Sequence, residues 1–199
     1  MTMQDFFENS SQFARLSPAD GSVSNPPRSR NRGRREFQMM LRDELHLTRQ
    51  PEPGQEIILA ILLSREYAAR LSDERLFKPA QITDQQFNVL RILRGGPAGG
   101  YLIREIRDRM ISRSADVPRL VERMVRSGLV ARREDPADRR GCLVRLTPAG
   151  EALEARLAPI HSELCREVAG FLDPAASREL LDLLQAFRDG IARNLEKTD

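Results

Sequence analysis

Arginine side chains gather in two short stretches of the second half of the chain, and each stretch also carries an acidic side chain. A guanidinium group presents a planar fork of donors that matches phosphate oxygens and the edge of guanine. Side chains of this kind indicate binding to a nucleic acid. The candidate contact residues are Arg113, Ser114, Asp116, Arg119, Arg123, Asp138, Arg139 and Arg140.

The first stretch lies on a predicted helix from Ala115 to Gly128. Ser112 or Ser114 is expected to cap its N-terminus, and Gly128 is expected to be left-handed after its C-terminus. Pro118 costs little in the first turn, where no helical amide bond is lost, but it cannot donate to a base or a phosphate. Apolar residues recur at three- and four-residue spacing and predict one buried face: Val117, Leu120, Val121, Met124 and Val125.

The second stretch lies at the tip of a predicted β-hairpin. Two β-prone runs, Leu129–Glu134 and Cys142–Thr147, flank the turn-rich segment Asp135–Gly141. Thr147 is expected to cap the next helix, with Pro148 in its first turn. A helix followed directly by a basic hairpin indicates a winged helix-turn-helix, in which the helix enters the major groove of DNA and the hairpin follows the backbone.

Within this arrangement the start of the helix faces the DNA, so Arg119 is the best candidate for a contact with a base or a phosphate. Asp116 is expected to cap the helix or to orient a neighbouring arginine, although it can also accept from a cytosine amino group. Arg123, one turn later, either contacts DNA or forms a structural salt bridge, and the salt bridge is favoured.

The first half of the chain predicts helices at Glu36–Thr48, Glu56–Leu76, Thr83–Leu93 and Leu102–Met110. The nearly continuous apolar start of the second of these helices predicts burial on several sides. Thr83 and Gln86 predict a capping box. The glycine-rich segment Arg94–Tyr101 lacks both phosphate-loop motifs and is interpreted as a flexible connector.

Two C-terminal helices follow, with apolar seams close to 3.5 residues per repeat that predict a self-association region. From Tyr101 to Thr147 there are 12 arginines against 7 acidic residues, whereas from Pro148 to Asp199 there are 6 basic against 10 acidic residues. Positive charge is thus concentrated on the predicted DNA-binding part. The expected organisation is a basic flexible tail at 1–35, dimerisation helices at 36–82, a winged helix-turn-helix at 83–147 and dimerisation helices at 148–199.

The motifs RLVERM, SGLVARR, DRR and LTPAG, in this order and spacing, resemble the core of the multiple-antibiotic-resistance-regulator (MarR) family of bacterial transcription regulators. The resemblance covers about Gln55 to Asn194, and Pro118 departs from it, because the family commonly has Ser or Thr there. It implies that Arg140 reaches the minor groove, that Asp138 holds its guanidinium group and that Arg139 contacts a phosphate.

The same resemblance implies a pocket for a small aromatic effector, for which Tyr67, Phe87 and His161 are candidates; ordinary core packing is the alternative for each. A thiol-based redox switch is a rival mode of control. Cys142 lies beside Arg140, where positive charge can lower the pKa of a thiol, and Cys165 is expected to be a packing residue.

No run of about 18 apolar residues and no signal pattern is present, so a cytoplasmic protein without a membrane partner is expected. His46 and His161 are the only histidines, so no metal site is expected, and no motif indicates a cofactor or an enzyme.

The prediction is a mainly α protein with a small β-wing: a homodimer that binds double-stranded DNA at a pseudo-palindromic operator, most simply as a repressor released by an effector. A redox-sensing regulator and a winged-helix module that binds protein are the alternatives.

Overall fold

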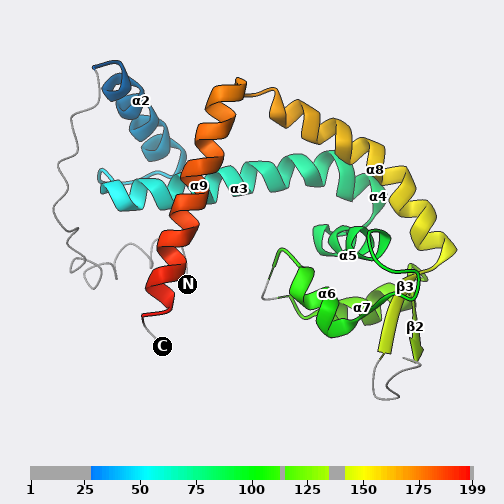
Figure 1. The fold of residues 1–199 in the computed structure, drawn as a ribbon. Helices are drawn as coiled ribbons and strands as arrows, with labels where there is room; N and C mark the ends of the chain where they lie inside the picture. The colour runs from blue at the N-terminus through cyan, green and yellow to red at the C-terminus, as the bar shows by residue number, and fades with distance from the viewer. Residues whose placement is uncertain (1–27, 113–114, 135–141, 198–199) are drawn as a thin grey trace. The chain divides into compact units, whose positions relative to one another are not determined.

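The computed structural model of the chain describes residues 28–112, 115–134 and 142–197, with side chains from residue 35 onward. Within these ranges the protein is mainly helical and carries one small antiparallel sheet, which confirms the predicted fold class (Figure 1). The predicted tail up to residue 27 and the tip of the predicted hairpin lie outside the described residues. The chain divides into two compact units, residues 1–63 and 64–199.

The first unit begins with α2, Arg28–Glu44. This helix starts before the predicted position, Glu36, so residues 28–35 are helical and the predicted boundary of the tail was wrong. α2 ends before the predicted Thr48 because His46 takes a left-handed conformation, with φ 50°. The amide of Leu47 then bonds back to the last turn of the helix, at 2.9 Å from the Arg42 carbonyl, which satisfies one of its free carbonyls.

The helix α3, Pro53–Ser72, follows and runs from the first unit into the second. Its apolar start was predicted to be buried on several sides. In the single chain the buried residues of this helix are Glu56 and Leu59, at 5% and 1% exposure, whereas Ile57 is 51% and Leu62 is 44% exposed. The expectation was wrong for the isolated chain, because just one stripe of this helix is covered there.

The second unit contains the remaining helices and all three strands. A five-residue π-helical turn ends α3, and in it the amide of Lys78 bonds to the carbonyl of Asp73. The elements are η2 Asp73–Phe77, α4 Lys78–Ala80, α5 Asp84–Arg94, β1 Tyr101–Leu102, α6 Ile103–Arg109, α7 Val117–Arg126, β2 Val130–Glu134, β3 Cys142–Leu146, α8 Pro148–Ala169 and α9 Pro174–Leu195.

The helix caps follow the sequence. Thr83 and Gln86 form the predicted capping box at the start of α5. The Thr147 hydroxyl accepts from the amide of Gly150 at 3.1 Å at the start of α8. Asp173 accepts from two amides of the first turn of α9. These three polar side chains satisfy amides that a helix N-terminus leaves without partners.

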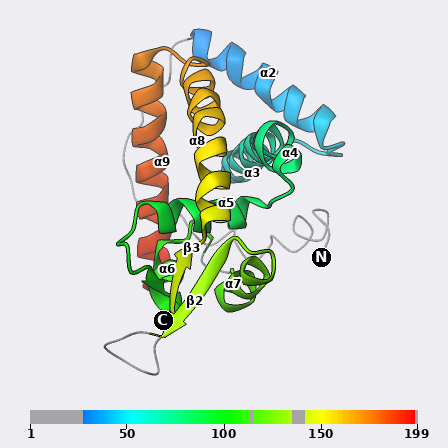
Figure 2. The same cartoon turned by 90° about the vertical axis from the view of Figure 1, so that its right-hand side faces the viewer.

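The sheet has the strand order β1-β3-β2, and both pairings are antiparallel. Strands β2 and β3 run side by side as the predicted hairpin (Figure 2). Strand β1 was not predicted, since the helix of this region was expected to begin at Leu102. It pairs Tyr101 with Val144 across the ladder. The preceding Gly100 has φ 90°, and a Cβ there would collide with the Val144 carbonyl, so the close pairing requires glycine.

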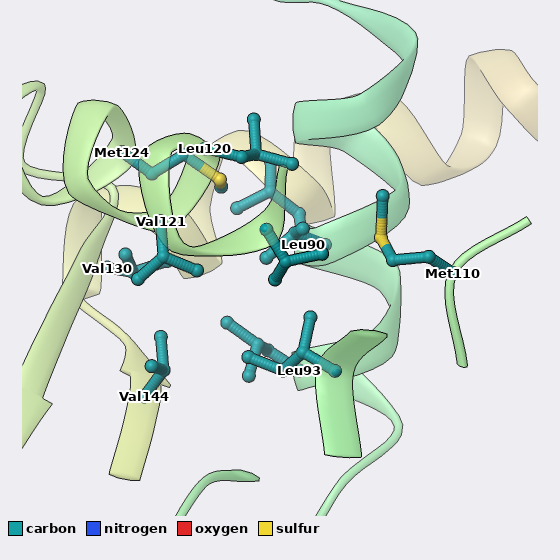
Figure 3. Close-up of a cluster of buried hydrophobic side chains, with 11 residues drawn as sticks. Leu90, Leu93, Met110, Leu120, Val121, Met124, Val130 and Val144 are labelled. Carbon is teal, nitrogen blue, oxygen red and sulfur yellow. The ribbon is translucent and has the colours of Figure 1, made fainter. Parts of the chain in front are cut away.

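One hydrophobic core joins α5, α6, α7 and the sheet, and its side chains converge from all four (Figure 3). A second, smaller cluster lies between η2, α5 and α8. The first cluster packs α7 and the hairpin against α5 and α6, and the second packs α5 against η2 and α8. The first consists of Val89, Leu90, Leu93, Ile106, Met110, Val117, Leu120, Val121, Met124, Val130 and Val144; the second of Leu76, Phe77, Phe87 and Leu157.

The two C-terminal helices bury little of their apolar seams within the chain. On α8, Leu157 and Leu164 are buried, but Val168 is 48% exposed. No residue of α9 is buried, and Leu195 is 65% exposed. Of the helices in the described ranges, none is long and apolar enough to cross a membrane.

Candidate nucleic-acid interface

The helix α7 separates an apolar face from a basic one. Val117, Leu120, Val121 and Met124 are buried as predicted, whereas Val125 is 36% exposed, so its predicted burial was wrong. Val125 lies at the edge of the apolar stripe, where the described chain covers it only in part. Three arginines and one glutamate occupy the exposed face of the helix: Arg119, Glu122, Arg123 and Arg126.

Asp116 organises the start of α7. It is the N-cap residue, in place of the predicted Ser112 or Ser114, and its Oδ1 accepts from the amide of Arg119 at 3.3 Å. Its Oδ2 lies 3.3 Å from Nε of Arg119. The carboxylate therefore does both things that were expected of it, capping the helix and orienting the neighbouring guanidinium group. Pro118 lies in the first turn, where it removes no helical bond.

The other end of α7 leads directly into the hairpin. Gly128 has φ 72°, as predicted for a C-terminal glycine. The amide of Leu129 bonds to the Met124 carbonyl at 2.9 Å, and the amide of Gly128 to the Val125 carbonyl at 3.0 Å. This pair of bonds closes the helix and sends the chain straight into β2.

Cross-strand register assigns the arginines of the hairpin to its two faces. Val144 is buried in the core and opposes Arg132, so that face points inward. Ala131 opposes Arg145 and Arg133 opposes Leu143, which puts the Arg133 and Arg145 side chains on the outer face. The hairpin therefore carries positive charge along its strands as well as at its predicted tip.

Several of the predicted contact residues are not described by the structure. Arg113, Ser114, Asp138, Arg139 and Arg140 all lie outside the described ranges. Their predicted contacts with DNA stay predictions. The salt bridge favoured for Arg123 does not form with any residue in the described ranges.

Sequence reasoning overlooked the basic residues of α6. Arg104, Arg107 and Arg109 are exposed on the helix that precedes α7. The guanidinium group of Arg109 lies 4.3 Å from the ring centroid of Tyr101, and its Nη1 donates to the Glu105 carbonyl at 2.9 Å. The signal was present in the sequence, because these arginines avoid the apolar positions of the helix.

A buried carboxylate joins this scaffold to α8. The side chain of Glu154 is 4% exposed, and its two oxygens lie 3.3 Å from Nη1 of Arg91 and 3.6 Å from Nε of Arg94. Both arginines are about half exposed and lie on α5. The pairing satisfies a charge that would otherwise be costly to bury.

Two of the three effector candidates lie together. The rings of Phe87 on α5 and His161 on α8 have centroids 5.3 Å apart. Burial lowers the pKa of His161, and the positive charge of Arg91 lowers it further. Phe87 is 5% exposed, whereas Tyr67 on α3 is 58% exposed.

The two cysteines differ in their surroundings. Cys142, at the start of β3, is partly buried. Cys165 is exposed, so the prediction that it packs was wrong, and its Sγ lies 3.8 Å from each ring nitrogen of His161 one turn earlier on α8. In the part of the chain that the structure describes, no group of three or more His, Cys, Asp or Glu side chains could hold a metal ion.

Comparison with known proteins agrees with this geometry. A family model described as "MarR family" matches residues 80–141. The homoprotocatechuate degradative operon repressor of Escherichia coli is 28% identical over 131 residues, which are 66% of this chain and 86% of the repressor.

Two solved structures reach higher identity. A mutant of MarR from E. coli, complexed with operator DNA, is 30% identical with a TM-score of 0.57, covering 69% of this chain and 99% of that one. BpsR of Bordetella bronchiseptica, solved to explain regulation of its DNA binding by 6-hydroxynicotinic acid, is 30% identical with a TM-score of 0.54, covering 65% of this chain and 98% of that one.

Proposed function

Because this chain belongs to the MarR family of transcription regulators, we propose that it binds a pseudo-palindromic DNA operator as a homodimer and represses transcription. The helix α7 enters the major groove, and the β2–β3 hairpin follows the backbone. A small aromatic effector releases the protein from DNA. A relative named as an operon repressor supports repression, and one solved with operator DNA supports the binding of an operator.

The observation that carries the proposal is the geometry at the start of α7. Asp116 engages Nε of Arg119, at 3.3 Å, on a side chain that is 83% exposed. No other described residue forms an ion pair with this guanidinium group, so its terminal amino groups can bind a partner from outside the chain. Such a fork matches the O6 and N7 acceptors of guanine, and the position at the helix N-terminus is the one that faces bases.

The wing supplies the backbone contacts. Arg133 on its outer face, with Arg139 and Arg140 at its tip, gives phosphate-binding charge next to α7. In our proposal Arg140 enters the minor groove and Asp138 orients it. An arginine in that position favours narrow, A·T-rich sequence, where the potential is more negative.

Self-association is supported by apolar side chains that the single chain leaves exposed. They lie on the first turns of α3 and along α9, two helices of the predicted dimerisation regions. Helix seams of this kind need a partner, and a second copy supplies two-fold symmetry that matches a palindromic site. The side chains are Ile57, Ile58, Leu62, Leu180, Leu181, Leu183, Ile191 and Leu195.

For the effector, Phe87 and His161 supply an aromatic wall and a polar tip. The lowered pKa of His161 keeps its ring neutral at physiological pH, so it can accept or donate a hydrogen bond. BpsR, whose ligand is a hydroxylated pyridine acid, illustrates the size of molecule that a relative responds to.

Selection of duplexes from a random library at two salt concentrations tests the DNA-binding proposal. We expect the parent protein to recover a two-fold-symmetric motif, and its affinity to fall with a log–log slope of about −0.9 per phosphate contacted. Arg119→Ala should lose preference at one base pair in each half-site. The matched control is Arg156→Ala, which removes the same charge from the exposed surface of α8.

The outcomes separate the alternatives. A salt-dependent affinity without a motif would leave a non-specific DNA binder. Absence of duplex binding would favour a winged-helix module that binds protein. Equal motifs from the parent and Arg119→Ala would remove Arg119 from the readout.

The second candidate function is a thiol-based redox-sensing regulator, which the exposed Cys165 thiol beside His161 favours. Peroxide would oxidise this thiol to a sulfenic acid. In that case peroxide should weaken the binding of DNA by the parent protein and leave Cys165→Ser unaffected. Equal responses of the two proteins would refute this role for Cys165.

A further inference from the structure

A polar pocket lies at the base of the wing, apart from the proposed DNA-binding and effector residues. Its volume is about 200 Å³, and the end of α5, the connector to β1, the end of β3 and the first turn of α8 form its walls. The volume is below the range of about 300–1,000 Å³ that is typical for drug-sized ligands. The pocket thus suits a small metabolite. Its charged lining residues are Arg94, Arg145 and Glu151.

Two of these three charges have no ion-pair partner among the described residues. Arg145 and Glu151 pair neither with each other nor with any other residue that the structure describes. Arg94 forms an ion pair with the buried Glu154, with its Nε 3.6 Å from Oε2, and its side chain remains 53% exposed. The pocket therefore offers two guanidinium groups and one carboxylate to an occupant.

The connector that forms one wall is closely packed, contrary to its interpretation as flexible. A Cβ at Gly96 would collide with the ring of Tyr101, and one at Gly100 would collide with the Val144 carbonyl. The amide of Gly96 also bonds to the Leu93 carbonyl of α5 at 3.2 Å, and the amide of Gly100 bonds to the Pro97 carbonyl at 2.9 Å. Because these glycines pack closely against Tyr101 and Val144, this wall of the pocket is preformed.

The position of the pocket argues against a phosphate of the operator as its occupant. β3 runs from Cys142, next to the wing tip, to Leu146, and the pocket is lined from Arg145 and Leu146 at the far end. At about 3.3 Å per residue, roughly 10 Å of strand separates the pocket from the tip. A wing that meets DNA with its tip leaves its base free for another ligand.

We propose that this pocket binds a small polar α-amino acid. The carboxylate of the ligand pairs with Arg145 and Arg94, and its ammonium group pairs with Glu151. A guanidinium fork binds a carboxylate with two parallel hydrogen bonds, and an ammonium group is the natural partner of the unpaired Glu151. A simple anion would pair with the arginines, but it has no positive group to offset its repulsion from the Glu151 carboxylate.

Isothermal titration calorimetry of the full chain, without DNA, tests the proposal with three matched probes. L-serine carries both charged groups, L-glycerate has a hydroxyl in place of the ammonium group, and ethanolamine lacks the carboxylate. We expect L-serine to bind with a Kd of about 1 mM or tighter, and each of the other probes to bind at least about tenfold more weakly.

Two variants and one control locate the site. Arg145→Ala should weaken the binding of L-serine by about tenfold, and Glu151→Gln should remove the advantage of L-serine over L-glycerate. Arg133→Ala is the control, because it removes an arginine from the same face of the hairpin outside the pocket. Thermal unfolding of each variant confirms that it is folded.

Several results would overturn the proposal. They are no binding of L-serine, equal binding of L-serine and L-glycerate by the parent, and unchanged binding by Arg145→Ala. Because the measurement contains no DNA, its result does not depend on whether the proposed regulation of transcription is correct.

Discussion

Replacing Asp116 separates its two tasks at the start of α7. In Asp116→Asn the amide oxygen can still accept from the amide of Arg119, so the cap survives while the negative charge beside Nε of Arg119 is lost. Asp116→Ala loses both interactions. Because the cap bond is long, at 3.3 Å, we expect Asp116→Ala to cost about 1 kcal/mol, within the usual range for N-caps.

The cost for Asp116→Asn should be much smaller. The ion pair joins side chains that are 83% and 56% exposed, and exposed pairs contribute only about 0–1 kcal/mol. For a chain of this size 1 kcal/mol corresponds to roughly 2–4 °C in Tm. Thermal unfolding should therefore show a drop of about that size for Asp116→Ala and a drop of less than about 1 °C for Asp116→Asn.

The binding of DNA should respond to both substitutions, because each removes the negative charge beside Nε of Arg119. A bidentate contact between an arginine and guanine is worth about 1–3 kcal/mol of discrimination, and a guanidinium group without its carboxylate samples other orientations. Asp116→Asn should therefore lose about fivefold in discrimination at one operator position, while its affinity for non-specific DNA stays equal or rises because a negative charge has gone.

Competition titrations with the selected operator and a single-base variant measure this effect. If Asp116→Asn keeps full discrimination at every operator position, Asp116 does not position Arg119. If Asp116→Asn unfolds at the same temperature as Asp116→Ala, the cap assignment is wrong.

Three further predictions concern the scaffold behind α7. Glu154→Gln should lower the free energy of unfolding by about 1–2 kcal/mol, less than the ~3–5 kcal/mol of a fully buried pair, because the half-exposed Arg91 and Arg94 can regain water. Gly150→Ala should cost about 1–3 kcal/mol, since its Cβ would collide with the Leu129 carbonyl, whereas Gly190→Ala on α9 meets nothing within 4 Å and should stabilise by about 0.5–1 kcal/mol. His161→Gln should flatten the pH dependence of stability below about pH 6.5, because the lowered pKa of the folded state means that the unfolded chain takes up the proton first as the pH falls.

Chemical denaturation measures the first two effects, and thermal unfolding across a pH series measures the third. A change below about 0.3 kcal/mol for Glu154→Gln would mean that its ion pairs contribute nothing net. Equal effects of Gly150→Ala and Gly190→Ala would contradict the close approach of Gly150 to the Leu129 carbonyl. A parent protein whose stability increases as the pH falls from about 6.5 to 5 would contradict the direction of the His161 shift.

The buried face of α7 and the caps of α5 and α8 were predictable because they depend on neighbours in the sequence. Helical spacing alone assigned Leu120 and Met124 to the core, and the local sequence assigned Thr83 and Thr147 to their caps. The turn after α7 was also predictable from the local sequence, because glycine is the residue best suited to the φ of 72° at Gly128. Short-range rules therefore recovered the helix, the hairpin and their order.

What escaped prediction depends on residues that are distant in the sequence. β1 has two residues and exists only because Val144, more than forty residues later, pairs with Tyr101. The cap of α7 could not be identified from the sequence alone, because the segment Ser–x–Ser–Ala–Asp at 112–116 contains three competing acceptors. Cys165 lies between apolar positions of α8, but which side of that helix is covered is decided by packing against α5.

The arrangement of β3 governs how movement can pass through the second unit. This strand is bonded on both edges, to β1 and to β2, and only Thr147 separates it from α8. Thr147 is itself fastened, since its amide bonds to the Leu129 carbonyl at 3.1 Å. Because these bonds fix the junction between β3 and α8, we expect the wing and α8 to turn together. A rotation of α8 should then reach the wing through Thr147.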